Sequence, residues 1–272
     1  MASESEESER NMFATTRDGI RIGYTIFGNA DAPKKVALVH SLAMDRTFWQ
    51  PVAEDLAKDA AILVIDCRGH GVSDKPEGPY SVDQFADDLA GVLDHLGWAQ
   101  VTVGGCSMGG CVTLAFAIRH KARVKSLVLC DTTAWYGEDA PKVWKERADK
   151  GVADGLASLI PFQKSRWFSD KFNAEHDDVV QHCNKIFVAN DPHAYHASCI
   201  MLGIADMRAG LSGINVPTRI LVGEEDYATP VAMAEYLAAN IKGSQLTIAK
   251  GARHLSPLEI PGQVAGKLRE II

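Results

Sequence analysis

Short apolar runs alternate with amphipathic stretches along most of this 272-residue chain. The runs lie at residues 36–39, 61–65, 101–103, 126–129 and 219–222, and a further strand is predicted at 245–249. Runs of this length without alternating polar positions are typical of strands buried on both faces of a parallel sheet. The intervening sequence has helical spacing at residues 49–57, 81–96, 230–241, from 108 and from 261. Strands that alternate with helices predict a doubly wound α/β sheet.

The pattern begins differently, with two β-rich stretches close together. Residues 12–16 and 20–27 flank Asp18 and Gly19, a pair that is a strong signal for a hairpin turn. We therefore predict that the chain enters the sheet through an antiparallel hairpin. Together with the later runs, this gives a mostly parallel sheet of eight strands.

The alternation of strands and helices stops between residues 135 and 214, where helical patterning dominates. We expect residues 12–134 and 215–272 to form the core domain and residues 135–214 to form a helical lid. Such an insertion can cover the carboxyl ends of the strands, where open α/β sheets bind ligands. Residues 1–11 are polar and low in complexity, so we expect them to be a disordered tail.

Composition and charge narrow the class of protein. A formal net charge of −7 without a run of basic residues argues against nucleic acid as a partner. No apolar stretch approaches the roughly 20 residues that span a bilayer, and the first ten residues are acidic, unlike a signal peptide. We therefore expect a cytoplasmic protein without a membrane partner. The six cysteines are scattered and fit buried free thiols better than a metal site, and none is predicted.

The strongest chemical signal is the sequence G-x-S-x-G at residues 105–109. It follows the apolar run 101–103 directly and precedes a helical pattern that starts at Met108. A serine on such a strand-to-helix turn has a strained backbone and an exposed hydroxyl, and the small residues around it let the turn close. We therefore predict that Ser107 is a nucleophile.

A serine nucleophile needs a base, and the base needs an acid that fixes its tautomer. His254 follows the last predicted strand, and Asp226 follows the strand at 219–222, so both belong to loops at the carboxyl edge of the sheet. The chain order Ser, Asp, His is that of this type of triad. Asp131, at the end of the strand before the insertion, is an alternative acid.

Two backbone amides complete the predicted site. The amide of Met108 follows the nucleophile, and the amide of Leu42 lies in the loop after the strand 36–39, where the second half of an oxyanion hole is expected. His40, at the end of that strand, is interpreted as a residue that hydrogen-bonds the backbone and shapes the loop.

With these residues in place, the chain resembles the α/β-hydrolase superfamily, and the resemblance extends over nearly its whole length after the tail. It is most similar to the 3-oxoadipate enol-lactonases of aromatic catabolism. The segments that carry the resemblance are HSLAMD, DCRGHGVSD, GGCSMGG, LVGEEDYATP and GARHLSPLEIP. The resemblance implies an α/β-hydrolase fold with a lid, hydrolysis by Ser107, His254 and Asp226, and no cofactor.

The resemblance also directs attention to the predicted lid, where we expect Trp135, Trp144, Arg147 and Trp167 to contact the substrate. Trp135 stands where those lactonases have a substrate-facing arginine. An indole offers apolar surface and cannot neutralise a buried carboxylate. We therefore expect an uncharged substrate, unless Arg147, Arg166 or Arg208 supplies the missing cation.

The function expected from these residues is hydrolysis of a small lactone or carboxylic ester through an acyl-enzyme. Two alternatives remain open. One is a carbon–carbon bond hydrolase of aromatic ring-fission products, which would use the same three residues. The other is a ligand receptor on the same fold. The sequence does not indicate an oligomeric state.

Overall fold

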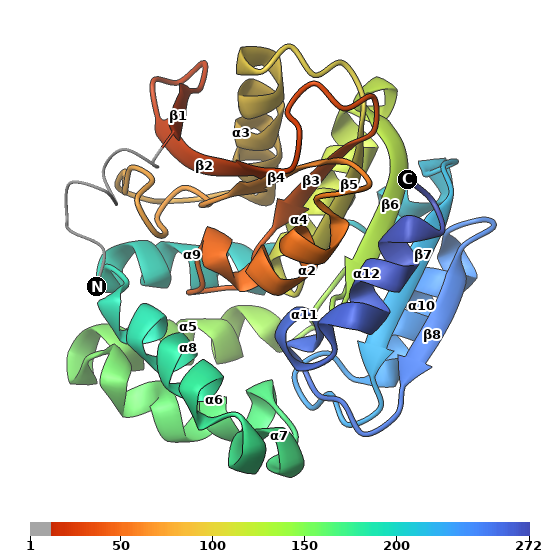
Figure 1. Cartoon of the computed structure of the whole chain (residues 1–272). Coiled ribbons are helices and arrows are strands. Elements are labelled where there is room, and N and C mark those ends of the chain that lie inside the picture. The colour runs from red at the N-terminus through yellow and green to blue at the C-terminus, as the bar shows by residue number, and fades with distance from the viewer. Residues whose placement is uncertain (1–11) are drawn as a thin grey trace.

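The computed structural model describes residues 12–272, so the predicted tail at residues 1–11 lies outside the described residues (Figure 1). One sheet has the strand order β1-β2-β4-β3-β5-β6-β7-β8. The pairs β1–β2 and β2–β4 are antiparallel and the other pairs are parallel, which confirms the mostly parallel sheet of eight strands. The strands are β1 (Met12–Thr15), β2 (Arg21–Phe27), β3 (Lys35–Val39), β4 (Ala61–Ile65), β5 (Val101–Cys106), β6 (Val124–Cys130), β7 (Thr218–Gly223) and β8 (Gln245–Ala249).

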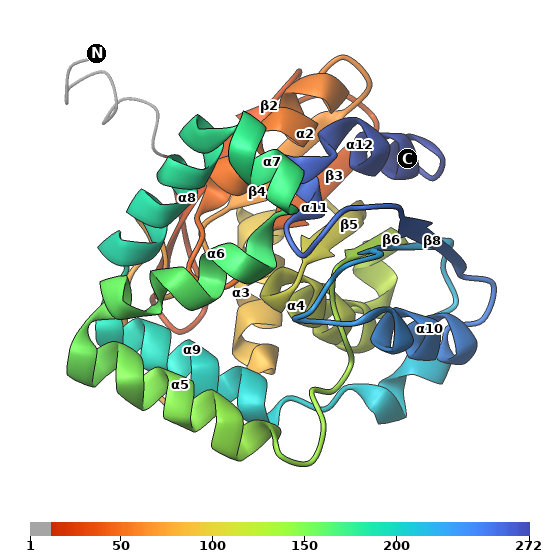
Figure 2. The same cartoon turned by 90° about the horizontal axis from the view of Figure 1, so that it is seen from below.

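Helices cover both faces of this sheet (Figure 2). One face carries α2 (Gln50–Leu56) and α12 (Pro261–Arg269), and the other carries α3 (Val82–His95), α4 (Met108–Arg119) and α10 (Val231–Asn240). The helix α3 begins with the expected capping box, because the side chains of Ser81 and Gln84 each accept a hydrogen bond from the other residue's backbone N–H. A short helix that the sequence did not predict, α11 (Ser256–Glu259), precedes α12.

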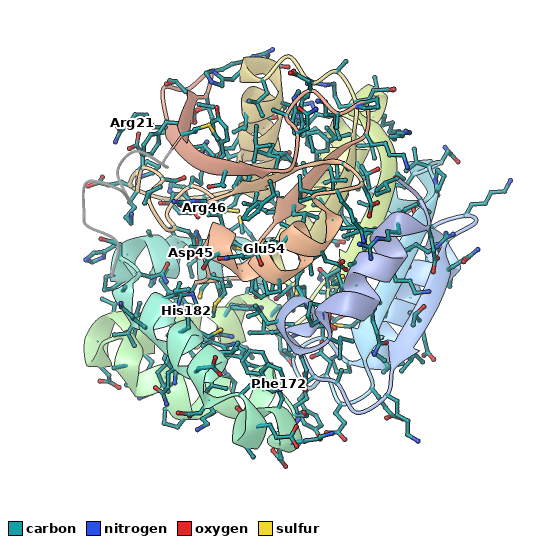
Figure 3. All side chains as sticks on the ribbon, viewed as in Figure 1. Arg21, Asp45, Arg46, Glu54, Phe172 and His182 are labelled. Carbon is teal, nitrogen blue, oxygen red and sulfur yellow. The ribbon has the colours of Figure 1, made fainter. Side chains whose placement is uncertain are left out.

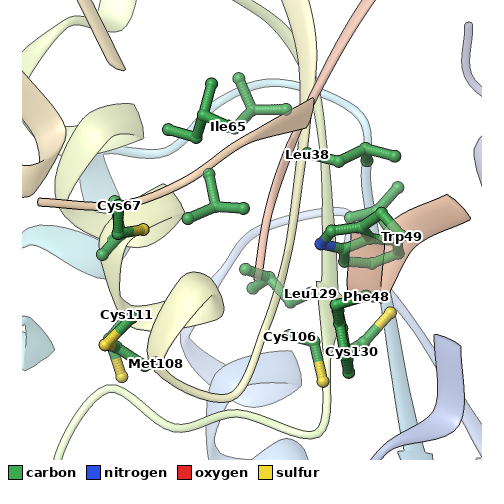
Figure 4. Close-up of a cluster of buried hydrophobic side chains, with 14 of the residues drawn as sticks. Leu38, Phe48, Trp49, Ile65, Cys67, Cys106, Met108, Cys111, Leu129 and Cys130 are labelled. Carbon is green, nitrogen blue, oxygen red and sulfur yellow. The ribbon is translucent and has the colours of Figure 1, made fainter. Parts of the chain in front are cut away.

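The core explains why the strand runs are continuously apolar. Leu38 of β3, Ile65 of β4 and Leu129 of β6 are fully or almost fully buried between the two helical layers, and Trp49 lies beside Leu38 (Figure 4). All six cysteines belong to the hydrophobic core and are buried free thiols, as the sequence predicted. Central strands flanked by helices on both faces have no solvent side on which polar residues could alternate.

Between β6 and β7 the chain forms five α-helices, which Figure 1 shows below the sheet, on the side of the strands' carboxyl ends. We call residues 135–214, which contain these helices, the insertion. Two of its helices, α5 and α9, pack along each other. The helices are α5 (Ala140–Asp154), α6 (Ile160–Trp167), α7 (Asp170–Glu175), α8 (Asp177–Ala189) and α9 (Pro192–Ile204), with 3-10 turns at Leu156–Leu159 and Arg208–Gly213.

The insertion is hydrogen-bonded to loops of the sheet. His182 of α8 lies beside the loop after β3 (Figure 3), with its Nε2 3.3 Å from the hydroxyl oxygen of Thr47. The side-chain amide of Asn190 donates to the Ala43 carbonyl at 2.9 Å, and the Leu255 N–H donates to the Trp167 carbonyl at 3.0 Å. These bonds hold the insertion against the loops after β3 and β8. In residues 12–272, no helix combines the length and apolarity needed to cross a bilayer.

Candidate active site

Ser107 lies at the turn between β5 and α4, and its backbone is strained. Its φ of 55° and ψ of −118° are outside the regions that side-chain-bearing residues ordinarily adopt. Its N–H donates to the Cys130 carbonyl at 3.0 Å, which fixes the turn against the neighbouring strand β6. The strained turn holds the hydroxyl above the carboxyl end of the sheet.

Two glycines make this turn possible. A Cβ atom at Gly105 would lie 2.1 Å from the carbonyl oxygen of Gly109, and one at Gly109 would lie 2.1 Å from the carbonyl oxygen of Val39. Both clashes are with backbone, which cannot move aside as a flexible side chain can. The spacing G-x-S-x-G is therefore required by the close approach of β3, β5 and α4.

We expect Gly105→Ala to lower the free energy of unfolding by about 3 kcal/mol or more, because the new methyl group forces strand and helix apart. Gly266→Ala is the matched control. A Cβ at Gly266 meets no atom within 4 Å, and this helical position in α12 should gain about 0.5–1 kcal/mol. Urea unfolding measures both. Equal stability of the two variants would contradict the role given to Gly105.

The structure brings Ser107, His254 and Asp226 together. The Nε2 of His254 lies 2.9 Å from the Ser107 hydroxyl oxygen, and its Nδ1 lies 2.8 Å from Oδ2 of Asp226. The Asp226 carboxylate also accepts hydrogen bonds from the N–H groups of Ala228 and Thr229, at 2.8 and 2.9 Å, and from the Thr229 hydroxyl at 2.8 Å. With Asp226 as acceptor, the Nδ1 of His254 carries the proton, and the unprotonated Nε2 faces the Ser107 hydroxyl.

The charges of this pair support each other. Burial is the largest influence on both side chains and opposes their charged forms. The attraction between the two charges and the hydrogen bond that joins them, with smaller contributions from Thr229 to Asp226 and from Asp131 to His254, together outweigh burial. As a result the pKa of His254 is raised and the pKa of Asp226 is lowered. An imidazolium formed during attack by Ser107 would therefore be stabilised where it forms.

Asp131, the alternative acid, has other partners. Its carboxylate accepts hydrogen bonds from the N–H groups of Gly223 and Ser256, both at 3.0 Å, and the Cys106 thiol lies 3.7 Å away. Burial, and then the nearby Asp226 carboxylate, raise the pKa of Asp131 to about 7. The imidazole of His254 is hydrogen-bonded to Asp226 and not to Asp131. Asp131 instead connects the loop that carries Asp226 with the loop that carries His254.

The two predicted oxyanion amides have no competing acceptor. Within the described part of the chain, neither the Leu42 N–H nor the Met108 N–H donates a hydrogen bond. The loop that carries Leu42 is held by His40, whose Nδ1 donates to the Ser41 carbonyl at 2.8 Å while its Nε2 accepts from the Cys67 N–H at 3.0 Å. Burial lowers the pKa of His40, so the ring stays neutral in this role.

A cavity of about 570 Å³ opens above Ser107 and His254. Its floor includes Ser41 and Leu42, and the loop after β7 supplies Ala228 and Thr229. The insertion forms the opposite wall, chiefly through α5 and α6. That wall includes Tyr136, Val143, Trp144, Arg147, Leu159, Phe162, Gln163, Arg166 and Trp167.

Three of the four residues expected at the substrate lie in this wall, but Trp135 does not line the cavity. The backbone of Trp135 forms an isolated bridge with Asp206, and the Arg208 guanidinium lies 3.7 Å from the centroid of its ring. The neighbouring Tyr136 lines the cavity instead, because consecutive side chains of an extended segment point to opposite sides. The structure does not place Trp135 among the residues that line this cavity, so the expectation of an uncharged substrate loses the support that it took from this position.

Sequence reasoning also missed other parts of the cavity wall. Tyr136 and Phe162 were not singled out for contact with a substrate, and Arg166 was considered only as a possible replacement cation. The one feature of the sequence that pointed to these residues was the density of aromatic and basic residues in the insertion. That density did not show which side chains face Ser107.

Residues on both sides of His254 are bonded to the insertion. The Arg253 guanidinium donates to the Phe168 carbonyl and to the Asp170 carboxylate, both at 3.0 Å, and the Leu255 N–H is bonded to Trp167. The imidazole is therefore positioned by the insertion as well as by Asp226. Within residues 12–272, no group of three or more His, Cys, Asp or Glu side chains is arranged to hold a metal ion.

Comparison with known proteins agrees with this geometry. Residues 36–261 match the family model described as the alpha/beta hydrolase fold. The chain is 30% identical to 3-oxoadipate enol-lactonase 2 of Acinetobacter baylyi over 246 residues, which cover 90% of this chain and 91% of that relative.

Solved structures show the same similarity. The enol-lactonase from Burkholderia xenovorans LB400 superposes with a TM-score of 0.91 at 31% sequence identity, over 96% of this chain and 99% of the other. A thermophilic esterase from Thermogutta terrifontis, solved with malate bound, has a TM-score of 0.89 at 29% identity, over 96% and 97% of the two chains. The similarity extends over the sheet and the insertion alike.

Proposed function

Because the chain belongs to the α/β-hydrolase family, we propose that it is a serine hydrolase that cleaves a small lactone or carboxylic ester through an acyl-enzyme. The observation that carries this proposal is the hydrogen-bonded series from Ser107 through His254 to Asp226 at the floor of the cavity. The names of the relatives, enol-lactonases and an esterase, favour the same reaction type.

The first half of the reaction forms the acyl-enzyme. The Ser107 oxygen attacks the substrate carbonyl carbon while Nε2 of His254 takes the hydroxyl proton, and Asp226 stabilises the imidazolium. The N–H groups of Leu42 and Met108 hold the negative charge on the carbonyl oxygen. The carbon–oxygen bond of the ester then breaks, and His254 gives its proton to the departing oxygen.

The second half releases the acid. A water molecule gives a proton to His254 and attacks the acyl carbon, and the Ser107 oxygen leaves with the proton from the imidazolium. From a lactone, the departing oxygen stays attached to the acyl chain, so a single hydroxy or keto acid is released. In both halves of the reaction His254 first accepts a proton from the attacking oxygen and then donates it to the departing oxygen.

The insertion, residues 135–214, acts in this proposal as a lid domain over the core formed by residues 12–134 and 215–272. Support comes from its position, since α5 and α6 form the cavity wall that faces Ser107. Apolar side chains on that wall exclude water and strengthen the electrostatic interactions at the floor. The substrate is a small molecule of a size that fits about 570 Å³.

A panel of substrates tests the proposed reaction. We expect the protein to hydrolyse short aryl esters or small lactones, and the Ser107→Ala variant supplies the blank. A dienoate ring-fission product tests the carbon–carbon bond hydrolase. If only that substrate is cleaved, the ester and lactone assignment is wrong. If ligands bind with no turnover of any substrate, a receptor on this fold replaces the enzyme.

The rate should also depend on pH through His254. The base must be neutral, and Asp226 raises its pKa despite burial, so kcat/KM should rise with pH with a midpoint above the ordinary value of about 6.5. Initial rates between about pH 6 and pH 9 at constant ionic strength measure this. Circular dichroism at each pH establishes that the protein stays folded. A profile that falls across this window would contradict a histidine base.

A further inference from the structure

The hydroxyl of Tyr136 lies close to the nucleophile but has no part in the reaction proposed for Ser107, His254 and Asp226. Tyr136 lines the cavity together with Ser107. Its ring packs edge-on against the ring of Trp144, with 5.1 Å between the centroids. Its hydroxyl oxygen lies 3.9 Å from the sulfur of Cys111, which follows Ser107 by four residues in α4. The hydroxyl is therefore held over the first turn of that helix, at the floor of the cavity.

This hydroxyl has a proton to donate. The Cys111 thiol donates to the Thr133 carbonyl at 3.3 Å, and a sulfur atom is a weak acceptor for the Tyr136 proton. Burial and the Cys111 thiol raise the pKa of Tyr136 well above its ordinary value of about 10, although a hydrogen-bond contact with the Ser107 side chain and the charge of Arg147 act in the opposite direction. Tyr136 therefore keeps its proton wherever His254 is neutral and active.

The segment that carries Tyr136 is fixed on both sides of the cavity floor. The Thr132 hydroxyl donates to the Ser107 carbonyl at 2.7 Å, which ties the segment to the turn of the nucleophile. The Met207 N–H donates to the Ala134 carbonyl at 2.9 Å, which ties it to the end of the insertion. A donor that is positioned before the reaction needs no reorganisation when charge develops beside it.

We infer that the Tyr136 hydroxyl donates a hydrogen bond to an oxygen of the negatively charged tetrahedral intermediate that forms on Ser107, which makes Tyr136 a catalytic residue. The inference rests on the proposed hydrolase function. The proposed amide donors, Leu42 and Met108, follow β3 and β5, whereas Tyr136 follows β6, so a separate element supplies this third donor. Because the negative charge exists in the intermediate and not in the bound ester, the bond accelerates turnover without tightening substrate binding.

Tyr136→Phe tests this role, because it removes the hydroxyl and keeps the ring against Trp144. We expect kcat for an aryl ester to fall about 10- to 100-fold, with KM within about threefold of wild type. Tyr236→Phe is the matched control, since it removes the same atom from an exposed residue of α10 that does not line the cavity, and its kcat should stay within about threefold of wild type. The thermal unfolding midpoints of both variants should lie within about 2 °C of wild type.

Binding of phenylboronic acid separates this inference from the proposed function. The boron atom accepts the Ser107 oxygen while His254 takes the hydroxyl proton, which gives a negatively charged tetrahedral adduct and releases no leaving group. Titration calorimetry should give a Kd about tenfold or more higher in Tyr136→Phe than in wild type or Tyr236→Phe, and no binding in Ser107→Ala.

The outcomes distinguish the two claims. The expected loss of boronate affinity in a protein that turns over no ester would support the Tyr136 donor and overturn the hydrolase. Ester turnover in which Tyr136→Phe keeps both kcat and the boronate Kd within about threefold of wild type would overturn the donor and leave the hydrolase standing. A rise in KM with kcat unchanged would also overturn it, because Tyr136 would then bind the ester and not the intermediate.

Discussion

Ser107→Ala is expected to fold as the wild type does and to lose about 10⁴-fold or more of kcat for ester hydrolysis. The methyl group of alanine fits the same turn, because the close approaches that limit this turn are at Gly105 and Gly109. The oxygen that would form the acyl bond is gone, and no other described hydroxyl is hydrogen-bonded to Nε2 of His254. Steady-state rates with an aryl ester and a thermal unfolding curve measure the two parts of this result.

Ser158→Ala is the matched control for this variant. Ser158 lines the same cavity but is exposed, and among residues 12–272 its hydroxyl is bonded only to the Gly155 carbonyl, at 2.7 Å. Its removal should leave kcat within about threefold of wild type. If Ser107→Ala kept a tenth of the wild-type kcat while folded, the nucleophile would have to be another group.

The second large effect is expected from the acid. Asp226→Asn should lower kcat by about 10³- to 10⁴-fold, because an amide does not stabilise the imidazolium and favours the wrong tautomer of His254. Asp131→Asn is the matched comparison, because it makes the same chemical change in a carboxylate that is not hydrogen-bonded to the imidazole. The Asp131 carboxylate accepts from the N–H groups of Gly223 and Ser256, whereas Asp226 lies 2.8 Å from Nδ1 of His254. The fold loss in kcat should be at least about 100 times greater for Asp226→Asn than for Asp131→Asn.

Thermal unfolding distinguishes the roles of the two aspartates further. Asp131→Asn places an amide group opposite a backbone N–H, so it should lower the free energy of unfolding by about 1–3 kcal/mol. Its kcat should change far less than its stability. If Asp131→Asn abolished turnover and Asp226→Asn did not, the acid would be the residue at the end of β6.

The sheet and its turn at Ser107 could be predicted from the sequence because both depend on local features. Buried parallel strands are continuous apolar runs, and the tight turn leaves a short sequence signature, because a Cβ at position 105 or 109 would meet backbone atoms. His254 and Asp226 follow strands whose carboxyl ends meet at one edge. Their chain order and strand ends therefore indicated a common site before any distance was known.

The wall of the cavity could not be predicted in the same way. The side chain at position 135 faces away from the cavity because the extended segment after β6 pairs with Asp206, which is 71 residues further along the chain. Arg147 and Arg166 share the wall because α5 packs against α9 and the chain turns at Gly155, whose φ is 77°. Such contacts depend on helix packing, and the amphipathic spacing of each helix does not encode which neighbour it meets.

The central claim, that Ser107 forms a covalent bond with the acyl group, is tested most directly by labelling with an aryl phosphonate ester. Phosphonates form a stable bond with an activated serine oxygen and release the aryl alcohol, so peptide mass spectrometry can locate the adduct. We expect one adduct per chain, on Ser107, and none in Ser107→Ala or after the protein is unfolded. An adduct on Cys106 or on another residue, with Ser107 unlabelled, would contradict the account.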